Sequence, residues 1–239
     1  MIGCAVTITG ADDDVQPEAM VRLSRMHPRL EWGLLCSDSR AGTPRYPSLA
    51  WVRAARWRLT VQGLPMAGHL CGAYARTLMR LEDLEIGRLP AELAPTSFRR
   101  IQVNGYEGGV RVTLPLVQQP GFEYVLQARD EARLSACAAD ARGRQCTPCS
   151  VLYDVSGGSG VRPTRWPAAP AGVRTGYAGG ISPGNVEAVL GELREANGGE
   201  WPAWIDMESG VRDARDRLDL AAVVQVLETV DRVCAGESS

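Results

Sequence analysis

Short apolar runs, many of them rich in β-branched residues, alternate along the chain with longer stretches in which apolar positions recur at helical spacing. The short runs predict eight strands, at residues 5–9, 32–36, 66–71, 99–103, 122–127, 150–154, 173–177 and 203–207. The longer stretches predict six helices, at residues 15–26, 48–59, 73–81, 130–141, 185–196 and 218–233. Such alternation is typical of an α/β protein with a parallel sheet.

The repeat of about thirty residues per strand–helix unit predicts one (β/α)8 barrel, an eight-stranded parallel TIM barrel that spans residues 1–239 as a single domain. A doubly wound open sheet is the alternative, but the turn after its first strand should be rich in glycine. Here Gly10 is followed by Ala11 and three aspartates, whose charge would repel a pyrophosphate. Two units are irregular. Residues 104–121 support no prediction, and residues 155–172 predict a long loop with a short or missing sixth helix.

Composition places the chain among soluble globular proteins, since 45% of its 239 residues are hydrophobic and 23% are charged. All 26 basic residues are arginine, and the lack of lysine excludes Schiff-base chemistry, a pyridoxal-phosphate lysine and a Walker P-loop. A formal net charge of −2 provides no basic surface for nucleic acid. No apolar run approaches the ~20 residues that span a bilayer. We therefore expect neither nucleic acid nor a membrane as a partner.

Seven cysteines, an odd number, follow no secretory segment, which indicates a reducing, cytoplasmic setting. The pair Cys146 and Cys149 has the spacing of a metal or redox motif. A zinc site needs a second pair, and a redox site needs a helix that begins there; the sequence offers neither. We therefore expect an ordinary loop at this pair, no metal site and no cofactor.

From residue 151 onward, several motifs stand in a distinctive order. They are Val151-Leu-Tyr-Asp154, Gly157-Gly-Ser-Gly160, Trp166, Ala178-Gly-Gly-Ile-Ser-Pro-Gly-Asn-Val186 and Ile205-Asp-Met-Glu-Ser-Gly-Val211. This series resembles phosphoribosylanthranilate isomerase, a barrel of tryptophan biosynthesis, in which a sixth strand ends in Asp and Gly-Ser-Gly, Gly-Gly-Leu-x-Pro-x-Asn-Val and Asp-x-Ser-Ser-Gly-Val turns follow. Upstream, Val6-Thr-Ile-Thr-Gly10, Pro44-Arg45-Tyr46 and Ile101-Gln-Val-Asn-Gly105 are similar to that family's first-strand, Lys-Arg-Tyr and Val-Gln-Leu-His-Gly segments.

Chemistry explains why glycine-rich turns recur after the late strands of such barrels. A sugar phosphate is held by fixed backbone N–H donors, which the loops after strands seven and eight supply. The residues that fit this phosphate-binding role are Gly179, Gly180, Ser209 and Gly210, with the start of a helix near Asn185. The alternative is that the two turns only close the barrel.

The resemblance implies an Amadori-type isomerisation, in which the ring of an aminoaldose phosphate opens and its C2 proton is removed to give an aminoketose. It implies that Asp154 is the general acid at the ring oxygen, that Asp206 binds ribose hydroxyls and that Arg45 binds the carboxylate of the aglycone. A role for Asp154 as a solvated strand-end carboxylate or helix cap stays open, as does a plain loop position for Arg45. The expected partner is a small phosphorylated sugar, with the chain a monomer or a homodimer.

The chain departs from the family at its first strand, where the family's general base is a cysteine and this sequence has Thr9. Threonine is not a base near neutral pH, and Cys4 lies five residues earlier, where a strand side chain faces the other way. Other groups near strand ends could replace that base; they are His69, Cys36, Asp12 and Asp38. A packed, hydrogen-bonded histidine is the alternative at residue 69.

We expect the strand-end residues Thr9, Cys36, His69, Asp154 and Asp206 to meet at the C-terminal mouth of the barrel. Asn104, which replaces a histidine of the family, implies a remodelled middle of the substrate pocket. Two alternatives to the isomerase remain: an enzyme that keeps the sugar-phosphate site but has another reaction, and a barrel that binds a sugar phosphate without catalysis or serves a larger assembly. The two aspartates favour catalysis, whereas the loss of the cysteine argues against the family's own reaction.

Overall fold

The computed structural model describes residues 3–80, 89–94, 97–105, 117, 119–143 and 148–235. Two segments discussed above fall outside these ranges: most of the irregular stretch 104–121, and Cys146 of the cysteine pair. Cys149, the other member of that pair, is the first residue of a strand.

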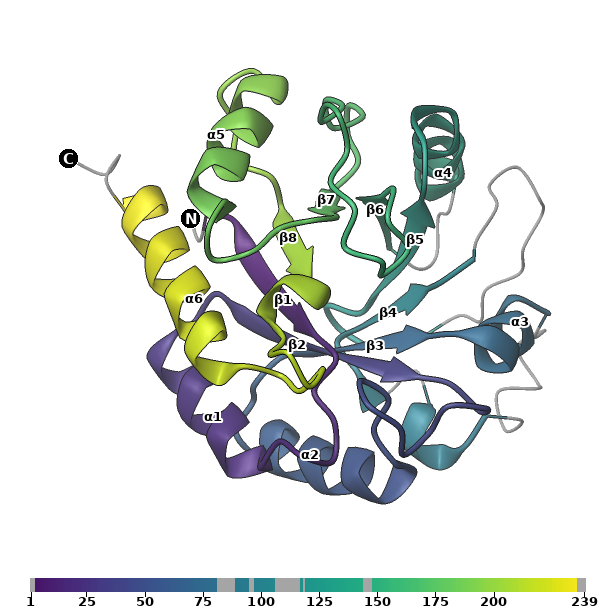
Figure 1. The fold of residues 1–239 in the computed structure, drawn as a ribbon. Helices are drawn as coiled ribbons and strands as arrows, with labels where there is room; N and C mark the ends of the chain where they lie inside the picture. The colour runs from purple at the N-terminus through teal and green to yellow at the C-terminus, as the bar shows by residue number, and fades with distance from the viewer. Residues whose placement is uncertain are drawn as a thin grey trace.

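Eight strands form one closed parallel barrel, in which each strand pairs with the next and the last pairs with the first (Figure 1). They are β1 (Ala5–Thr9), β2 (Leu30–Cys36), β3 (Met66–Leu70), β4 (Arg100–Val103), β5 (Glu123–Ala128), β6 (Cys149–Asp154), β7 (Thr175–Ala178) and β8 (Trp204–Met207). The predicted (β/α)8 barrel is confirmed, and the open-sheet alternative is wrong. No strand end differs from its predicted position by more than two residues.

Six α-helices lie outside the barrel in the described part of the chain (Figure 1). They are α1 (Pro17–Met26), α2 (Leu49–Val61), α3 (Gly72–Arg80), α4 (Glu131–Gly143), α5 (Val186–Ala196) and α6 (Leu220–Ala235). Two 3-10 turns, η2 (Ala91–Leu93) and η4 (Ser209–Val211), lie in the connections before β4 and after β8. Residues 155–174, between β6 and β7, form no helix, so the predicted long loop is confirmed.

The alternation of side chains along each strand separates the barrel interior from the surrounding apolar shell. In β1, Val6 and Ile8 belong to the core between strands and helices. Thr7 and Thr9 point the other way and form hydrogen bonds with side chains of other strands across the interior. The same alternation decides which strand-end residues can reach the mouth.

An ion pair and an aromatic ring fill the interior below the mouth. Arg100 of β4 donates from Nε to Glu31 Oε1 at 2.7 Å and from Nη2 to Thr7 Oγ1 at 2.8 Å. Its guanidinium carbon lies 4.2 Å from the ring centroid of Trp204. Gly176 leaves the space for this indole, since a Cβ there would lie 2.0 Å from the ring. The interior is therefore occupied at this level, and a ligand can enter only from the C-terminal side.

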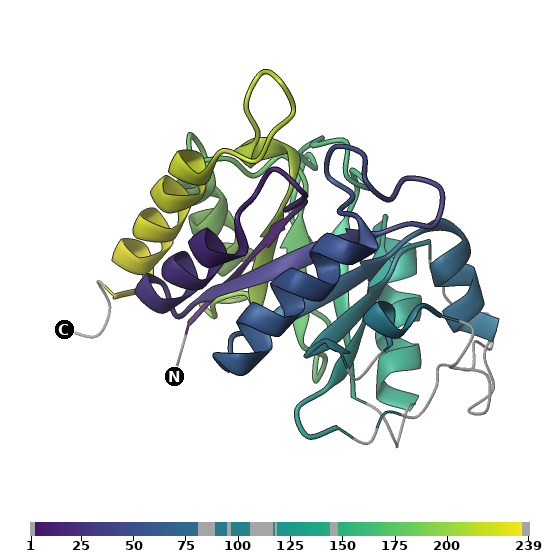
Figure 2. The ribbon, with the colours of Figure 1, turned by 90° about the horizontal axis from the view of Figure 1, so that it is seen from below.

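The loops at the C-terminal ends of the strands rise on one side of the molecule (Figure 2). The loop after β8 is a hairpin in which Arg212 and Leu218 form an isolated antiparallel bridge. In Figure 2 this hairpin and the loop after β2 both project from the top of the barrel. They form one wall of the mouth.

Candidate active site

A cavity of about 860 Å³ lies at the C-terminal ends of the strands. Its volume is within the usual range of small-molecule pockets. Ten predicted site residues line it, namely Thr9, Arg45, His69, Asn104, Asp154, Gly179, Gly180, Asp206, Ser209 and Gly210, whereas the candidate bases Cys36, Asp12 and Asp38 do not. The structure therefore brings residues from strands and loops far apart in the sequence to one place.

Cys36 does not line the cavity, and its predicted position at the mouth is wrong. It is the last residue of β2, but its neighbour Leu35 lines the cavity. Since strand side chains alternate, Cys36 faces outward into the apolar core, with Sγ 3.3 Å from the carbonyl oxygen of Leu34. Burial raises the pKa of this thiol well above its ordinary value. Cys36 is therefore neither exposed to a ligand nor ionised.

Three residues from three strands meet at the floor of the cavity. Thr9 Oγ1 donates a hydrogen bond of 2.8 Å to Oδ1 of Asp206. His69 Nε2 lies 3.8 Å from Oδ2 of the same carboxyl. Gly33 of β2 leaves room for them, because a Cβ at that position would lie 2.3 Å from Thr9 Oγ1 and 3.0 Å from His69 Nε2. We call Thr9, His69 and Asp206 the floor cluster.

Burial shifts both titratable groups of the floor cluster toward their neutral forms. It raises the pKa of Asp206 to about 8, although the Thr9 hydroxyl and the Arg100 guanidinium act in the opposite direction. It lowers the pKa of His69 to about 3, and the positive charge of Arg100 adds to this effect. At neutral pH the imidazole is therefore uncharged, and Asp206 exchanges a proton within the physiological range.

Asp154, at the end of β6, has different surroundings. Its Oδ1 accepts hydrogen bonds from Ser156 N at 3.0 Å, Ser156 Oγ at 2.7 Å and Gly157 N at 3.1 Å. Its Oδ2 accepts one hydrogen bond, from Gln127 Nε2 at 2.8 Å. The carboxyl thus holds the start of the loop after β6 and presents Oδ2 toward β5. Asp154 therefore lines the cavity, as predicted, and also has a structural role, because it fixes the loop after β6.

The glycine turn after β7 has the backbone geometry of an anion site. Gly179 and Gly180 have φ values of +117° and +63°, a region that favours glycine. Asn185, the residue before α5, donates from Nδ2 to Gly180 O at 2.8 Å and accepts from Ser182 N at 2.8 Å. Among the described residues, the N–H groups of Gly179 and Gly180 have no hydrogen-bond acceptor. The side chain of Asn185 therefore holds the turn in place, and the N–H groups of Gly179 and Gly180 are available to an anion.

The turn after β8 packs directly against the turn after β7. A Cβ at Gly210 would lie 1.9 Å from the carbonyl oxygen of Ile181, so only glycine permits this approach. The hydroxyl of Ser209 donates to Gly158 O at 2.9 Å and accepts from Arg45 Nη1 at 3.0 Å. The hydroxyl hydrogen of Ser209 is thus already in use, and this turn can offer an anion mainly backbone N–H groups.

Arg45 lines the cavity but is held by the protein itself. Its Nη1 lies 2.8 Å from Glu208 Oε1, and its Nη2 lies 2.7 Å from Asp216 Oδ1. Its Nε also donates to Asp216, at 3.0 Å. With the bond to Ser209, four of its five N–H groups have partners among the described residues. Arg45 therefore joins the loops after β2 and β8, and one N–H group remains for a ligand.

Asp12 and Asp38, the other predicted bases, do not line the cavity. Asp12 is buried and accepts a hydrogen bond from the backbone N–H of Arg45 at 2.7 Å. Its Oδ2 also lies 3.1 Å from Nη2 of Arg212, whose side chain is 2% exposed. Asp38 is exposed in the loop after β2. Both positions argue against proton transfer with a ligand inside the barrel.

Asn104, directly after β4, forms hydrogen bonds with two cavity neighbours. Its Oδ1 accepts from Gln102 Nε2 at 2.8 Å, and its Nδ2 lies 3.1 Å from Sγ of Cys71. All three residues line the cavity. The amide therefore stands in the middle of the pocket, as the sequence predicts, but within a polar network of the protein.

Sequence reasoning missed several lining residues. Glu208 stands where the resembling pattern has its first Ser, a departure that could have indicated the Arg45 ion pair. Gln127 occupies the inward strand-end position of β5, which alternation alone predicts. The contact of Asp216 with Arg45 joins residues 171 positions apart, and no sequence signal announces it.

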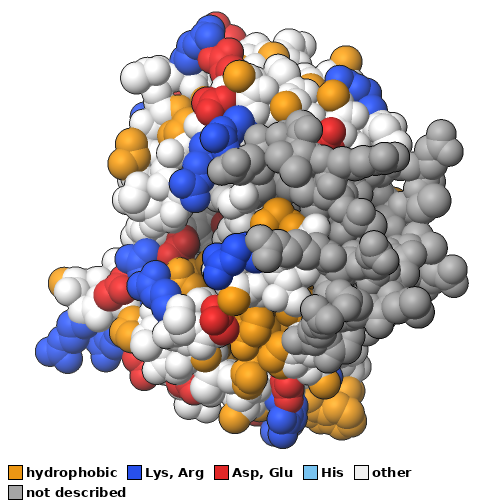
Figure 3. Space-filling view, turned by 90° about the vertical axis from the view of Figure 1, so that its right-hand side faces the viewer, with side chains coloured by type: hydrophobic (Ala, Val, Ile, Leu, Met, Phe, Trp, Pro, Cys, Tyr) orange, Lys and Arg blue, Asp and Glu red, His pale blue; other side chains and the backbone are white. Residues whose placement is uncertain are grey.

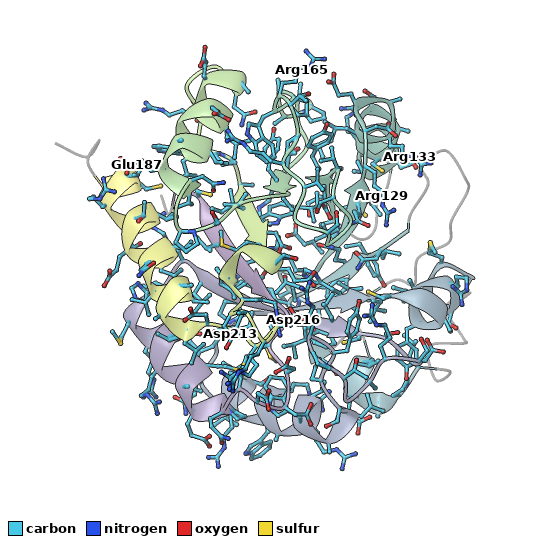
Figure 4. The ribbon with its side chains drawn as sticks, in the orientation of Figure 1. Arg129, Arg133, Arg165, Glu187, Asp213 and Asp216 are labelled. Carbon is cyan, nitrogen blue, oxygen red and sulfur yellow. The ribbon has the colours of Figure 1, made fainter. Side chains whose placement is uncertain are left out.

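Charged side chains of both signs surround the mouth. Arg129, directly after β5, and Asp216, in the hairpin after β8, line the cavity from different elements (Figure 4). Basic and acidic side chains also lie next to one another on the side of the barrel that Figure 3 shows. The mouth thus presents a mixed electrostatic environment.

The described residues contain no group of three or more His, Cys, Asp or Glu side chains placed to hold a metal ion. Within the same ranges, no helix is both long and apolar enough to cross a bilayer.

No protein-family profile matches the chain, and neither does any curated protein. Solved structures do match it. Phosphoribosyl anthranilate isomerase from Thermus thermophilus has a TM-score of 0.55 and 18% identity, over 96% of this chain and 99% of that chain. A phosphoribosyl anthranilate isomerase in complex with reduced 1-(o-carboxyphenylamino)-1-deoxyribulose 5-phosphate has a TM-score of 0.54 and 12% identity, over 96% and 99%.

A different enzyme has a similar fold at a lower sequence identity. A truncated 3-deoxy-D-arabino-heptulosonate 7-phosphate synthase from Thermotoga maritima has a TM-score of 0.56 and 8% identity, over 98% of this chain and 87% of that chain. At such identities the comparisons establish the fold, a TIM barrel like that of the isomerases, and the assignment of a reaction depends on the site.

Proposed function

We propose that this chain is an isomerase of the phosphoribosylanthranilate isomerase type, which converts a phosphorylated aminoaldose into an aminoketose. One observation carries the proposal: a single cavity combines two aspartates in different surroundings with a glycine turn whose N–H groups are open. Acid–base isomerisation needs one group that gives a proton and one that takes it. A sugar phosphate needs fixed donors.

The phosphate of the substrate would bind at the turns after β7 and β8. Gly179 and Gly180 supply open N–H groups, and the positive end of α5 follows them. Ser209 and Gly210 contribute backbone N–H groups at the start of η4. This arrangement holds an anion without lysine, which the chain lacks.

Asp154 would act at the ring oxygen. Three donors hold its Oδ1, whereas Oδ2 has only the amide of Gln127, so Oδ2 is the oxygen that can carry a proton. Rotation of that amide by half a turn would let its oxygen accept from a protonated Oδ2. Transfer of this proton to the ring oxygen breaks the C1–O bond as the nitrogen lone pair forms a C1=N bond.

The open-chain iminium then loses its C2 proton, and the C–H electron pair forms a C1=C2 bond while nitrogen recovers its lone pair. Return of a proton to C1 and loss of the O2 proton give the aminoketose, with no net gain or loss of electrons. Asp206 faces C2 and its hydroxyl in this proposal, because its Oδ2 accepts no hydrogen bond from a described residue. Arg45 and Asn104 would contact the aglycone side.

A direct assay tests the proposal. The wild type is incubated with phosphoribosylanthranilate, and the aminoketose is quantified by chromatography. Asp154→Asn should lower kcat by ~10²–10⁴ while the affinity for inorganic phosphate stays unchanged. Asp38→Asn is the matched control, since Asp38 is an exposed aspartate outside the cavity, and it should keep wild-type turnover. A wild type without product refutes the proposal.

A second candidate is an enzyme that keeps the phosphate turns but has another reaction. Two observations favour it: Thr9 replaces the family's cysteine, and Glu208 adds a carboxylate beside the turn after β8. Phosphate-dependent stabilisation of a wild type that leaves phosphoribosylanthranilate unchanged would support this candidate.

A further inference from the structure

Four carboxyl groups of the described residues line the cavity, and they differ in the partners that hold them. Asp154 accepts four hydrogen bonds. Glu208 lies 2.8 Å from a nitrogen of Arg45. Asp216 lies within 3.0 Å of both Arg45 and Arg212.

Asp206 accepts one hydrogen bond in the described structure, from the neutral hydroxyl of Thr9 to Oδ1, while Oδ2 faces the imidazole of His69 at 3.8 Å. Glu208 also accepts only one, but from the charged guanidinium of Arg45, and its side chain is less buried. An oxygen without a donor, at the floor of a ligand-sized cavity, is free to accept a proton from a bound molecule. None of the other three carboxyl groups combines burial with an open oxygen in this way.

The remaining base candidates are poorly suited. Cys36 faces the apolar core, and Asp12 and Asp38 lie outside the cavity lining. His69 does line the cavity, but burial and Arg100 lower its pKa to about 3. A base with so low a pKa accepts a proton poorly at neutral pH.

We propose that Asp206 is the catalytic base that moves the proton between C2 and C1 of the sugar, and that Thr9 is its positioning residue. This proposal rests on the proposed isomerisation. Oδ2 of the carboxylate takes the C2 proton as the C–H pair enters the C1=C2 bond. The protonated Asp206 then returns a proton to C1, and water takes the O2 proton. One carboxyl on one face of the sugar serves both steps.

The titratable and charged groups around Asp206 come from three strands and from the turn after β8. His69 faces it from β3, Arg100 from β4 and Asp154 from β6, and Glu208 is the first residue after β8. At the level of Asp206 the other strands present Thr9 on β1, Gly33 on β2, Gln127 on β5 and Ala178 on β7, none of which titrates. Glu31 of β2 lies in the interior below them and is paired with Arg100.

These neighbours act in opposite directions on the pKa of Asp206. Arg100 favours the carboxylate, whereas burial and the two other carboxyl groups disfavour it, and the pKa is raised to about 8. A carboxyl with this pKa is a far stronger base than an exposed aspartate and still ionises near neutral pH. The reaction should accelerate as pH rises toward 8, because the carboxylate is the reactive form.

Thr9 acts through Asp206. Its hydroxyl donates to Oδ1, which orients the carboxyl so that Oδ2 points to the cavity, and it stabilises the ionised form. The hydroxyl of Thr9 occupies the space that Gly33 leaves. The residue that replaces the family's cysteine thus becomes a support for a base on another strand.

Hydrogen exchange separates this role from that of Asp154. The ketose 1-(o-carboxyphenylamino)-1-deoxyribulose 5-phosphate cannot close a furanose ring, because its O5 carries the phosphate. Exchange of its C1 hydrogens with D2O therefore needs the base but no ring-opening acid. NMR in D2O follows this exchange. Asp206→Asn should slow it by ~10²–10⁴, whereas Asp154→Asn should leave it within a few-fold of wild type although conversion of the aldose is lost.

The pH profile tests the positioning role. Thr9→Val removes a donor that stabilises the carboxylate, so the rising limb of the exchange rate should move to higher pH by on the order of one unit. Thr9→Ser, which retains the hydroxyl, should keep the wild-type limb. A merely structural threonine would change the rate without moving the limb.

The outcomes separate the two proposals. If the wild type converts the aldose and Asp206→Asn still exchanges C1 at the wild-type rate, this inference is overturned and the isomerase proposal stands. If Thr9→Val leaves the limb in place, its positioning role is overturned. If the wild type neither converts the aldose nor exchanges the ketose, the isomerase proposal fails and the base assignment falls with it. Thermal unfolding of each variant checks that it is folded.

Discussion

Replacing Gly180 with alanine tests the phosphate site at one backbone position. Gly180 has a φ of +63°, and a Cβ there would lie 2.7 Å from Arg162 Cβ and 2.8 Å from Arg162 N. Because the atoms that this Cβ meets include backbone atoms of Arg162, which cannot move away as a flexible side chain would, the turn itself must shift. The N–H groups of Gly179 and Gly180 then no longer point at a common anion position. Gly198, after α5, is a matched control. Its φ is +65°, and a Cβ there meets nothing within 4 Å. Both alanines carry a left-handed backbone strain of about 1–2 kcal/mol, but only one displaces the turn.

The magnitude follows from ligand linkage. At a phosphate concentration 100 times its Kd, binding stabilises the native state by about 2.7 kcal/mol. For a chain of this size each kcal/mol raises Tm by about 2–4 °C, so the expected phosphate-induced shift is roughly 5–11 °C. Calorimetry with and without inorganic phosphate should show this shift in wild type and in Gly198→Ala, and little of it in Gly180→Ala. A full shift in Gly180→Ala, or its loss in Gly198→Ala, would refute the assignment of the turn.

Three further predictions concern charge and chemistry. Arg212→Met should lower the free energy of unfolding by about 3–5 kcal/mol, because it leaves Asp12 buried without its cation; a loss under ~1 kcal/mol in urea unfolding would contradict this. Asp206 has a raised pKa of about 8 against 3.8, so wild-type stability should fall as pH rises from 3.8 through 8. Asp206→Asn should lack that fall in urea midpoints measured across the range. Thr9→Cys should not raise isomerase turnover, because the base lies on Asp206; a tenfold gain would mean that the reaction was lost with the family's cysteine.

The barrel could be predicted because it depends on local information. Eight apolar runs at regular spacing, with helical patterns between most of them, leave a closed parallel barrel as the arrangement that buries every strand. The strand ends deviate little because turn residues mark them. The fourth unit gave no such pattern, and most of it lies outside the described residues.

The membership of the mouth was predictable in part. Thr9, His69, Asp154 and Asp206 are each the last or the last but one residue of a strand, and their side chains point inward, so strand position alone brings them together. Cys36 also ends a strand but has the outward phase, as the inward position of Leu35 reveals. Cys36 was placed at the mouth because it lies at the strand end, without regard to which side of the strand its side chain faces. Counting alternate positions from the strand core would have corrected this placement.

The wall formed by Arg45 was not predictable. The resemblance places an arginine there for a ligand carboxylate, yet Glu208 and Asp216 already supply carboxylates to it. These contacts join the loops after β2 and β8 across more than 160 positions. A local motif cannot report a partner at that distance. The arginine at residue 45 correctly indicated a position in the cavity lining. It did not indicate that Glu208 and Asp216 already accept hydrogen bonds from its guanidinium.

The two aspartates of the cavity show how surroundings decide a chemical role. Asp154 and Asp206 both lie at the inward, C-terminal ends of barrel strands. Four donors reach the first, and one reaches the second. Three of the donors to Asp154 hold its Oδ1 and so fix the start of the loop after β6, whereas burial raises the pKa of Asp206 to about 8. A sequence shows the residue type and its strand position, but the number of donors depends on loops folded from distant segments. The structure therefore moves the search for the base from the first strand to the eighth.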